Sequence, residues 1–305
     1  MSAAATPPDR VIMLRGLVLL ASILAATSAP RPLPFFYDLY TFRGDGGSTT
    51  VVAAFAVPVK RLHSERNQGV RYRFDVTLVL ADTALRSVSR TDDSVYVSVP
   101  RPLAGDHLLY THVELQAQPS RSTVHRVIMT DATTPGIGQL YSSPFQIPDY
   151  SGTHLMLSDI ALGQPGAESG WTRGDVTLAL LPTSQFPESS FDVYYEIYNL
   201  PFGNRYSTDI SIEPVDESGA TRLDEGNTVG TRFSGESAAD SDGSLPELRR
   251  VEASLDKGRH RLTVTVTDEM TGQTAERSRV LQVRGWGRGA TLVPALPSAR
   301  IGVLD

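Results

Sequence analysis

Apolar residues occupy every second position of residues 71–80, and this alternation limits the fold more than any other feature of the sequence. The segment reads RYRFDVTLVL, and its apolar positions are Tyr72, Phe74, Val76, Leu78 and Leu80. Successive side chains of a β-strand point to opposite faces, so the alternation predicts a strand with one buried face and one wetted face. Antiparallel sheets that are wet on one side typically show this pattern.

The same period of two recurs in two successive sets of segments. The first set covers residues 48–57, 71–80, 95–99, 109–117 and 122–130, and the last of these is expected to be the hairpin partner of the segment before it. The second set covers residues 176–180, 191–197, 206–212, 248–255, 262–266 and 277–283, with a polar hairpin loop at 268–275. No stretch shows a sustained helical period with caps. The sequence therefore predicts an all-β chain of two tandem antiparallel β-sandwich domains, immunoglobulin- or fibronectin-like, after an N-terminal signal segment.

The length of 305 residues fits two domains of ordinary size. We place the first β-sandwich at residues 35–148 and the second at 153–284, with prolines 144 and 148 near the boundary. Residues 285–305 contain glycine and proline and are expected to form a flexible tail. Residues 223–244 are rich in Gly, Ser, Asp and Glu and are expected to form a long loop.

The N-terminus, residues 1–29, has the features of a secretory signal peptide. Arg10 and Arg15 precede an apolar segment at 16–26, and small residues follow at 27–29. Cleavage after Ser28 would export the protein to the periplasm or cell envelope. The alternative is an uncleaved anchor helix, although a membrane span needs about 20 apolar residues.

Composition excludes several kinds of protein. The net charge of −6, without any run of five like charges, opposes a nucleic-acid binder and a polybasic membrane arm. The absence of cysteine excludes disulfides, thiolate zinc sites and a cysteine nucleophile.

A short motif occurs in both halves of the chain. Gly105-Asp106-His107 precedes one predicted strand, and Gly258-Arg259-His260 opens another about 150 residues later. A repeat of this size would be a whole domain, which predicts a tandem duplication. Chance is the alternative, because glycine is common before strands.

Two phrases of the second half carry a family resemblance. Residues 154–163 read HLMLSDIALG, and residues 191–200 read FDVYYEIYNL. Together with residues 258–268, they resemble the β-rich region of GWxTD-domain bacterial proteins over residues 35–284. The Gly-Trp-x-Thr-Asp pentapeptide itself is absent. The resemblance implies a β-rich fold and export, and it implies no defined activity.

The most suggestive candidate binding face lies within the second phrase. Tyr194, Glu196 and Tyr198 alternate with apolar residues and so share one strand face, where the two tyrosines would lie about 13 Å apart at about 3.3 Å per residue. Such a face could stack sugar rings or anchor a partner protein. The alternative is that this strand is buried on both faces or packs against the neighbouring domain. Ser158 and Asp159 are expected to form a turn or cap at the domain junction.

No residue pattern indicates catalysis, a metal or a cofactor. The six histidines are His63, His107, His112, His125, His154 and His260, and they lack the spacing of metal ligands. The Asp240–Ser244 segment only weakly resembles a calcium loop, and no serine lies in a nucleophile elbow.

Two functions from different classes stay open after the sequence analysis. The first is a non-catalytic envelope module that binds a protein or a polysaccharide. The second is a hydrolase or hydrolase-accessory module with a site built from loops. The sequence leaves the oligomeric state open.

Overall fold

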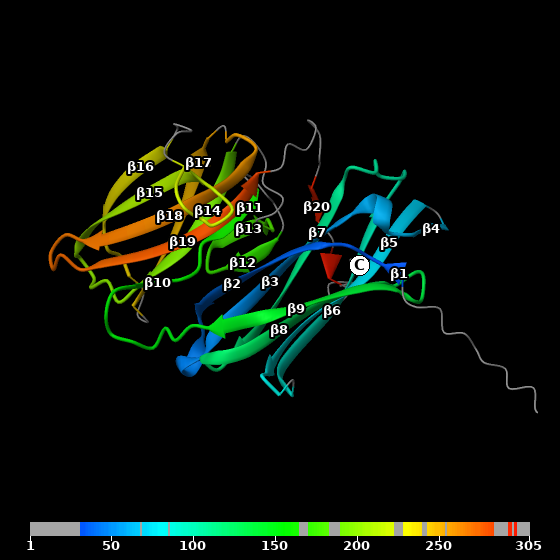
Figure 1. Cartoon of the computed structure of the whole chain (residues 1–305), viewed down its shortest axis with the longest axis horizontal. Coiled ribbons are helices and arrows are strands. Elements are labelled where there is room, and N and C mark those ends of the chain that lie inside the picture. The colour runs from blue at the N-terminus through cyan, green and yellow to red at the C-terminus, as the bar shows by residue number, and fades with distance from the viewer. Residues whose placement is uncertain are drawn as a thin grey trace, which may run out of the picture.

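The computed structural model describes residues 31–67, 69–84, 86–164, 170–182, 190–222, 228–239, 243–253, 255–283, 292–294 and 296–297. Apart from two short 3-10 turns, every regular element in these ranges is a β-strand. The strands form two lobes that lie side by side, one for each half of the chain (Figure 1). The predicted all-β fold is therefore confirmed.

The first lobe is a sandwich of two antiparallel sheets. One sheet has the order β2-β3-β7, and the other has the order β9-β8-β5-β6, with β4 also on β5. The bounds are β2 (Phe36–Arg43), β3 (Thr49–Pro58), β4 (Ser64–Asn67), β5 (Gly69–Asp82), β6 (Ser87–Val99), β7 (Leu108–Ala117), β8 (Ser120–Asp131) and β9 (Ile137–Ile147).

The second lobe repeats this arrangement. One sheet contains β11, β14 and β17 in that order, extended by β10, β13 and β12, and the other has the order β16-β15-β18-β19. The bounds are β10 (Met156–Leu157), β11 (Ala161–Gln164), β12 (Trp171–Arg173), β13 (Val176–Leu180), β14 (Ser190–Tyr198), β15 (Arg205–Val215), β16 (Val229–Glu236), β17 (Ser244–Glu252), β18 (Gly258–Asp268) and β19 (Thr274–Val283).

Period-two burial builds the core of each sandwich. In β5 the apolar positions from Val70 to Leu80 are buried, and the residues between them are exposed or half-buried. β18 behaves in the same way, with Leu262, Val264 and Val266 fully buried. The side chains from the two sheets of each lobe thus form one continuous core per lobe.

The segment at 122–130 is not the hairpin partner of the segment before it, as the sequence suggested. Only residues 118 and 119 separate β7 from β8, yet β8 pairs with β5 and β9 in the opposite sheet. The connection crosses between the two sheets, which period-two patterning cannot distinguish from a hairpin, because both present an apolar face to the same core.

Residues 223–244 contain a strand that the sequence analysis missed. β16 pairs with β15 along its full length, with Arg205 opposite Glu236 and Ile212 opposite Val229. All of its residues are exposed or half-buried. Because no residue of this edge strand is buried, its sequence lacks a strict apolar alternation and resembles that of a loop.

Two short strands lie in the segment that was expected to be a flexible tail at 285–305. β20 (Leu292–Pro294) pairs with β7, and β21 (Leu296–Pro297) pairs with β6. At the other end of the chain, β1 (Arg31–Pro32) pairs with β9. The predicted signal peptide at 1–29 lies outside the described residues. Among those described, no helix is long and apolar enough to cross a membrane.

The shared strand order shows which strands correspond. β8 and β18 hold the same position, and each carries a buried histidine, His125 or His260, followed by arginine. The proposed correspondence of His107 with His260 is therefore wrong, because His107 precedes β7, which corresponds to β17. Whether a duplication produced the two domains stays a prediction.

Each of these two strands ends in an aspartate that caps the following turn. Asp131 Oδ1 accepts hydrogen bonds from Thr133 N (2.8 Å) and Thr133 Oγ1 (2.6 Å). Asp268 Oδ1 accepts from Met270 N (2.9 Å), and its Oδ2 accepts from Thr271 Oγ1 (2.8 Å). These side chains replace backbone partners in the turn, as is common for Asx turns.

The buried histidines predict a loss of stability in mild acid. Burial lowers the pKa of His125 and of His260 below the ordinary value. Below the pKa of the unfolded chain, about 6.5, the unfolded state binds more protons than the native state, so the free energy of unfolding falls as pH drops. We expect a slope of up to about 1.4 kcal/mol per pH unit for each histidine in this range. Urea unfolding between about pH 7 and about pH 5, which covers the range below the unfolded pKa, measures it.

The control for this prediction is a matched pair of variants. His125→Gln together with His260→Gln should flatten the pH profile, whereas His154→Gln, at an exposed position, should leave it unchanged. An equal slope in all three proteins would contradict the assignment.

Candidate functional site

A third apolar cluster joins the two sandwiches. It lies where the outer face of the β2-β3-β7 sheet meets the outer face of the sheet that contains β14, β11, β13 and β12. Its buried members are Tyr40, Phe42, Val52, Ala54, Ala161, Trp171, Leu178, Leu180 and Tyr194. The Phe42 ring stacks on the Trp171 ring at a centroid distance of 5.0 Å. As a result, β3 is buried at all of its positions and β14 at nearly all.

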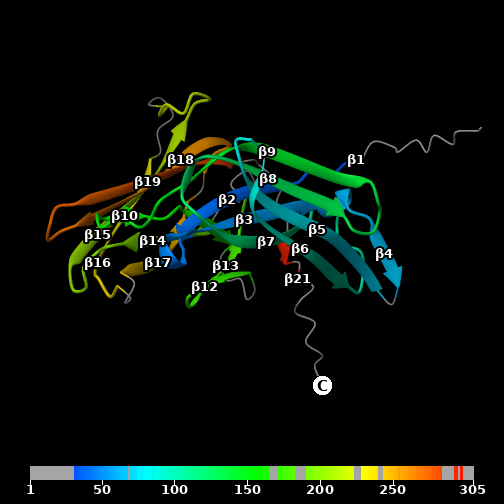
Figure 2. The same cartoon turned by 90° about the horizontal axis from the view of Figure 1, so that it is seen from below.

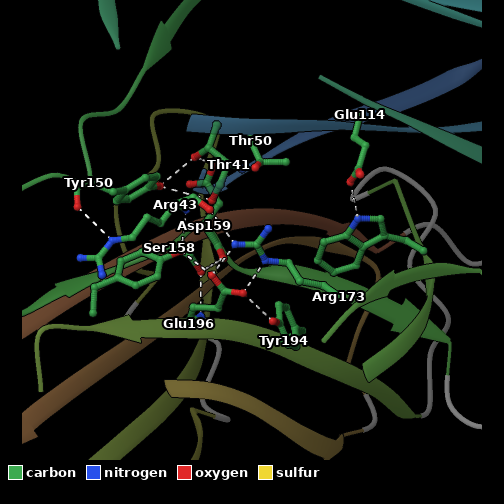
Figure 3. A network of polar contacts seen from close by, with 12 residues as sticks. Thr41, Arg43, Thr50, Glu114, Tyr150, Ser158, Asp159, Arg173, Tyr194 and Glu196 are labelled. Atoms are coloured by element: carbon green, nitrogen blue, oxygen red, sulfur yellow. Dashed lines mark hydrogen bonds and ion pairs between the residues drawn. The ribbon is translucent and has the colours of Figure 1, made fainter. Parts of the chain in front are cut away.

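The Glu196 carboxylate lies inside this interface and is 4% exposed (Figure 3). Its Oε1 accepts hydrogen bonds from Tyr194 Oη (2.7 Å) and Arg173 Nε (2.5 Å). Its Oε2 accepts from Tyr198 Oη (2.6 Å) and Arg173 Nη2 (2.9 Å). The bidentate guanidinium and two phenols together compensate a charge that would otherwise be very costly to bury.

Local strand geometry explains how these groups meet. Tyr194, Glu196 and Tyr198 share one face of β14, since they lie two residues apart. Arg173 ends β12 and also donates from Nη2 to the Arg43 carbonyl oxygen (2.7 Å) in the first domain. Its guanidinium lies 5.0 Å from the centroid of the Phe42 ring, a cation–π distance.

The ionisation of these groups follows from burial. Burial, reinforced by the Glu196 charge, raises the pKa of both Tyr194 and Tyr198 far above the ordinary tyrosine value, so both phenols stay hydrogen-bond donors. Burial by itself would lower the pKa of Arg173, but the hydrogen bonds and charge of Glu196 more than offset it, and the net pKa is raised. Arg173 and the two phenols therefore keep their protons near neutral pH and act there as hydrogen-bond donors to the carboxylate.

A second carboxylate, Asp159, ties three segments together. Its Oδ2 accepts from Thr41 N (2.9 Å) and Thr41 Oγ1 (2.6 Å) on β2, and its backbone N–H donates to the Thr41 carbonyl oxygen (3.0 Å). Its Oδ1 accepts from Arg277 Nε on β19 at 2.7 Å. Tyr150, in the segment between the domains, adds a hydroxyl contact to Thr41 Oγ1 at 2.8 Å (Figure 3).

Arg43, the last residue of β2, fixes the segment between the domains. Its Nε donates to the Tyr150 carbonyl oxygen (3.1 Å), its Nη2 donates to Asn199 Oδ1 (3.0 Å), and its guanidinium lies 4.2 Å from the centroid of the Tyr198 ring. Asn199 Nδ2 in turn donates to the carbonyl oxygens of Gly152 and His154, each at 2.8 Å. Asn199 has a φ of 63°, a left-handed conformation that asparagine tolerates better than most residues.

Two further contacts cross the interface away from Glu196. Trp171 Nε1 donates to Glu114 Oε2 on β7 (3.1 Å), and Arg279 Nη1 lies 2.7 Å from Asp38 Oδ2 on β2. Polar contacts between the domains therefore also join β12 to β7 and β19 to β2.

The predicted face of Tyr194, Glu196 and Tyr198 does exist, but it is not a surface for an external partner. Both tyrosines are fully buried, and all three side chains face the first domain. The alternative that β14 packs against the neighbouring domain is the arrangement observed. Ser158 and Asp159 lie at the domain junction, where Ser158 Oγ accepts from Glu196 N (2.8 Å). The sequence analysis missed Thr41, Arg43 and Arg173, because nothing in the sequence shows which exposed-looking polar residues face the other domain.

The described residues include no group of three His, Asp or Glu side chains that could hold a metal ion. A histidine and an aspartate meet at His63 Nδ1 and Asp131 Oδ2, 3.0 Å apart. That carboxylate already caps the turn after β8, so the pair has a structural role. A surface depression of about 700 Å³ between β5 and β6 is lined by Glu65, Gly69, Val70, Arg71, Ser98, Val99 and Pro100.

No model of a known protein family matches the chain, and no curated protein matches it either. Among solved structures, red sea bream transglutaminase is 12% identical at a TM-score of 0.23, with 81% of this chain and 31% of that chain covered. Bacteroides uniformis beta-glucuronidase is 9% identical at a TM-score of 0.26, with 78% of this chain and 26% of that chain covered. A calcium-binding mutant of Bacteroides uniformis beta-glucuronidase 2 is 9% identical at a TM-score of 0.26, with 80% of this chain and 28% of that chain covered. The chain thus spans about a third or less of each of these proteins.

Removing the Arg173 guanidinium should destabilise the protein strongly. In Arg173→Met, Glu196 would remain buried without a counter-charge, which typically costs about 3–5 kcal/mol. The free energy of unfolding from urea titration measures this loss.

A second ion pair of the chain serves as the control. The Arg86 side chain is 82% exposed in its pair with Asp82, so Arg86→Met should cost less than about 1 kcal/mol. Equal losses in the two variants would show that the Glu196 network contributes no more than a surface pair.

Proposed function

We propose that this chain is a non-catalytic, exported envelope module, in which two β-sandwiches are fixed as one rigid body that binds a protein or polysaccharide partner. The observation that carries the proposal is the interface itself, which has the buried aromatic cluster and compensated charges of a domain core. Interfaces between domains of one chain are more often polar and permit relative motion.

A fixed geometry suits a binding role. A partner that contacts both lobes meets surfaces that are already oriented, so binding loses less conformational freedom than it would on two mobile domains. The polar contacts across the interface strengthen this point, because any rotation of one lobe would separate Arg173 from the Arg43 carbonyl oxygen and Asp159 from Thr41.

We also infer that the resemblance to the β-rich region of GWxTD-domain proteins reflects this junction. Of the two phrases that carry the resemblance, one contains Ser158 and Asp159 and the other contains Tyr194, Glu196 and Asn199. In the structure the phrases contact one another, since Ser158 N donates to the Glu196 carbonyl oxygen at 3.0 Å. A relationship based on these residues would concern how the two domains are held together. The proposal of export rests on the sequence of residues 10–29.

The rigid body can be tested with paired spin labels, because the chain has no cysteine of its own. Leu140→Cys in β9 and Met270→Cys in the β18–β19 turn place one label on each lobe, at positions that are 48% and 62% exposed. We expect a single narrow distance distribution by pulsed electron paramagnetic resonance. The same pair combined with Arg173→Met should give a broader distribution, and a broad distribution without that substitution would overturn the rigid-body proposal.

Partner binding needs a separate experiment. The mature chain, starting at Ala29, is immobilised and exposed to envelope extract and to purified envelope polysaccharide, with Arg173→Met as the matched variant. The proposal expects one stoichiometric ligand that is retained intact and bound more weakly by the variant. Cleavage of the retained material by the immobilised chain would instead identify a hydrolase.

A further inference from the structure

The C-terminal strands pair with the first domain, although in sequence they follow the second. β20 runs parallel to β7, with Leu292 opposite Leu108, and β21 runs antiparallel to β6, with Leu296 opposite Tyr96. Figure 1 shows β20 beside β7, and Figure 2 shows β21 beside β6. Residues 292–294 and 296–297 thus pair with the first lobe, although they follow the second lobe in sequence.

The strands that receive this segment are the outermost long strands of the two sheets. β7 otherwise pairs only with β3, and β6 otherwise pairs only with β5, among the described residues. An unpaired strand edge presents backbone N–H and C=O groups that readily accept another strand. β6 and β7 are also in contact, and residue 295 alone separates β20 from β21. One peptide therefore pairs with the outer strands of both sheets, through three residue pairs on β7 and two on β6.

Proline limits what can be added beyond these segments. β20 and β21 end at Pro294 and Pro297, and β1, which covers β9 at the other edge, ends at Pro32. Proline has no backbone N–H, so a strand that contains it offers an incomplete edge to any further strand. The three short segments therefore cover part of the edges of β9, β7 and β6, and each ends in a residue that cannot donate a backbone hydrogen bond to a further strand.

The second domain has no equivalent cap among the described residues. Its corresponding strands are β16 and β17, which pair only with β15 and β14. β17 carries a proline of its own, Pro246, within its ladder. The first domain lacks this internal protection in β7, whose sequence LLYTHVELQA contains no proline. Among the described residues, pairing with the C-terminal segment is thus confined to the first domain.

We propose that the outer edges of β6 and β7 in the first domain form a peptide-binding site for an extended, apolar, proline-containing segment. In the intact chain, residues 292–297 are its ligand and bind in cis. Backbone pairing supplies affinity in such strand addition, and side-chain contacts at alternate positions supply specificity. Residues 284–291 tether the ligand to the second domain, and a short tether gives an effective concentration of about a millimolar. An external peptide of the same kind therefore binds only when the tail is released.

Cutting the tether in the full-length protein tests directly whether the edges of β6 and β7 bind a separate peptide. A site-specific protease sequence replaces residues 285–289, and a fluorescent peptide of residues 290–299 is titrated before and after cleavage. We expect saturable one-to-one binding to the cleaved protein and at least tenfold weaker binding to the uncut protein. A peptide with the same residues in scrambled order is the control. Lack of binding after cleavage, equal binding before and after, or equal binding of the scrambled peptide would overturn the proposal.

A disulfide trap tests the cis register and needs no cleavage. Tyr96→Cys and Leu296→Cys are directly opposite residues of an antiparallel pair, whose Cα separation of about 4.5–5.5 Å suits a disulfide. We expect oxidation to give a monomer with an internal crosslink, detected by non-reducing electrophoresis and peptide mapping. Failure to crosslink, or crosslinks only between two chains, would overturn the intramolecular assignment.

Discussion

Burial of the Glu196 carboxylate between two β-sandwiches is the constraint on which the rest of the structure depends. A charge that is 4% exposed is tolerable only while its donors stay in place, and Arg173 and two tyrosines supply them. Arg173 also donates to the Arg43 carbonyl oxygen, so the compensation of this charge is linked to the first domain. The relative position of the lobes thus follows from hydrogen bonds to Arg43 and Thr41 as well as from apolar contact.

The consequence is a stack of four sheets with three buried layers between them. β3 and β14 lie at the centre of the stack, which explains why both faces of β3 are apolar and why β14 is buried on both faces although one of them carries Glu196. The two carboxylates of β14 are paired, Glu196 with Arg173 and Asp192 with Arg250. Removal of either lobe would expose the aromatic cluster around Trp171 to water.

Period-two patterning predicted the strands at 71–80 and 262–266, because each has one buried and one wetted face. It placed Tyr194, Glu196 and Tyr198 on a common face for the same reason. It could not say what that face contacts. A face exposed to water and a face buried against a second domain both leave the same apolar alternation on the other face of the strand. β16 and the capping strands β20 and β21 escaped it because edge segments pair through the backbone, and their side chains need follow no period. Arg173, which pairs with Glu196, lies 23 residues away in sequence, and Arg43, which links Arg173 to the first domain, lies 130 residues from Arg173, so no local pattern could reveal either contact.

The most direct test of the account follows the interface and the strands in one unfolding experiment. The chain contains two tryptophans, so Trp286→Phe leaves Trp171, which is 1% exposed, as the sole reporter of the interface. Urea unfolding is then monitored by its fluorescence and by far-ultraviolet circular dichroism. If the lobes form one cooperative unit, the two signals change together with the same midpoint. A fluorescence change that is complete while the strand signal is still native would show that the lobes separate first, and would contradict the account.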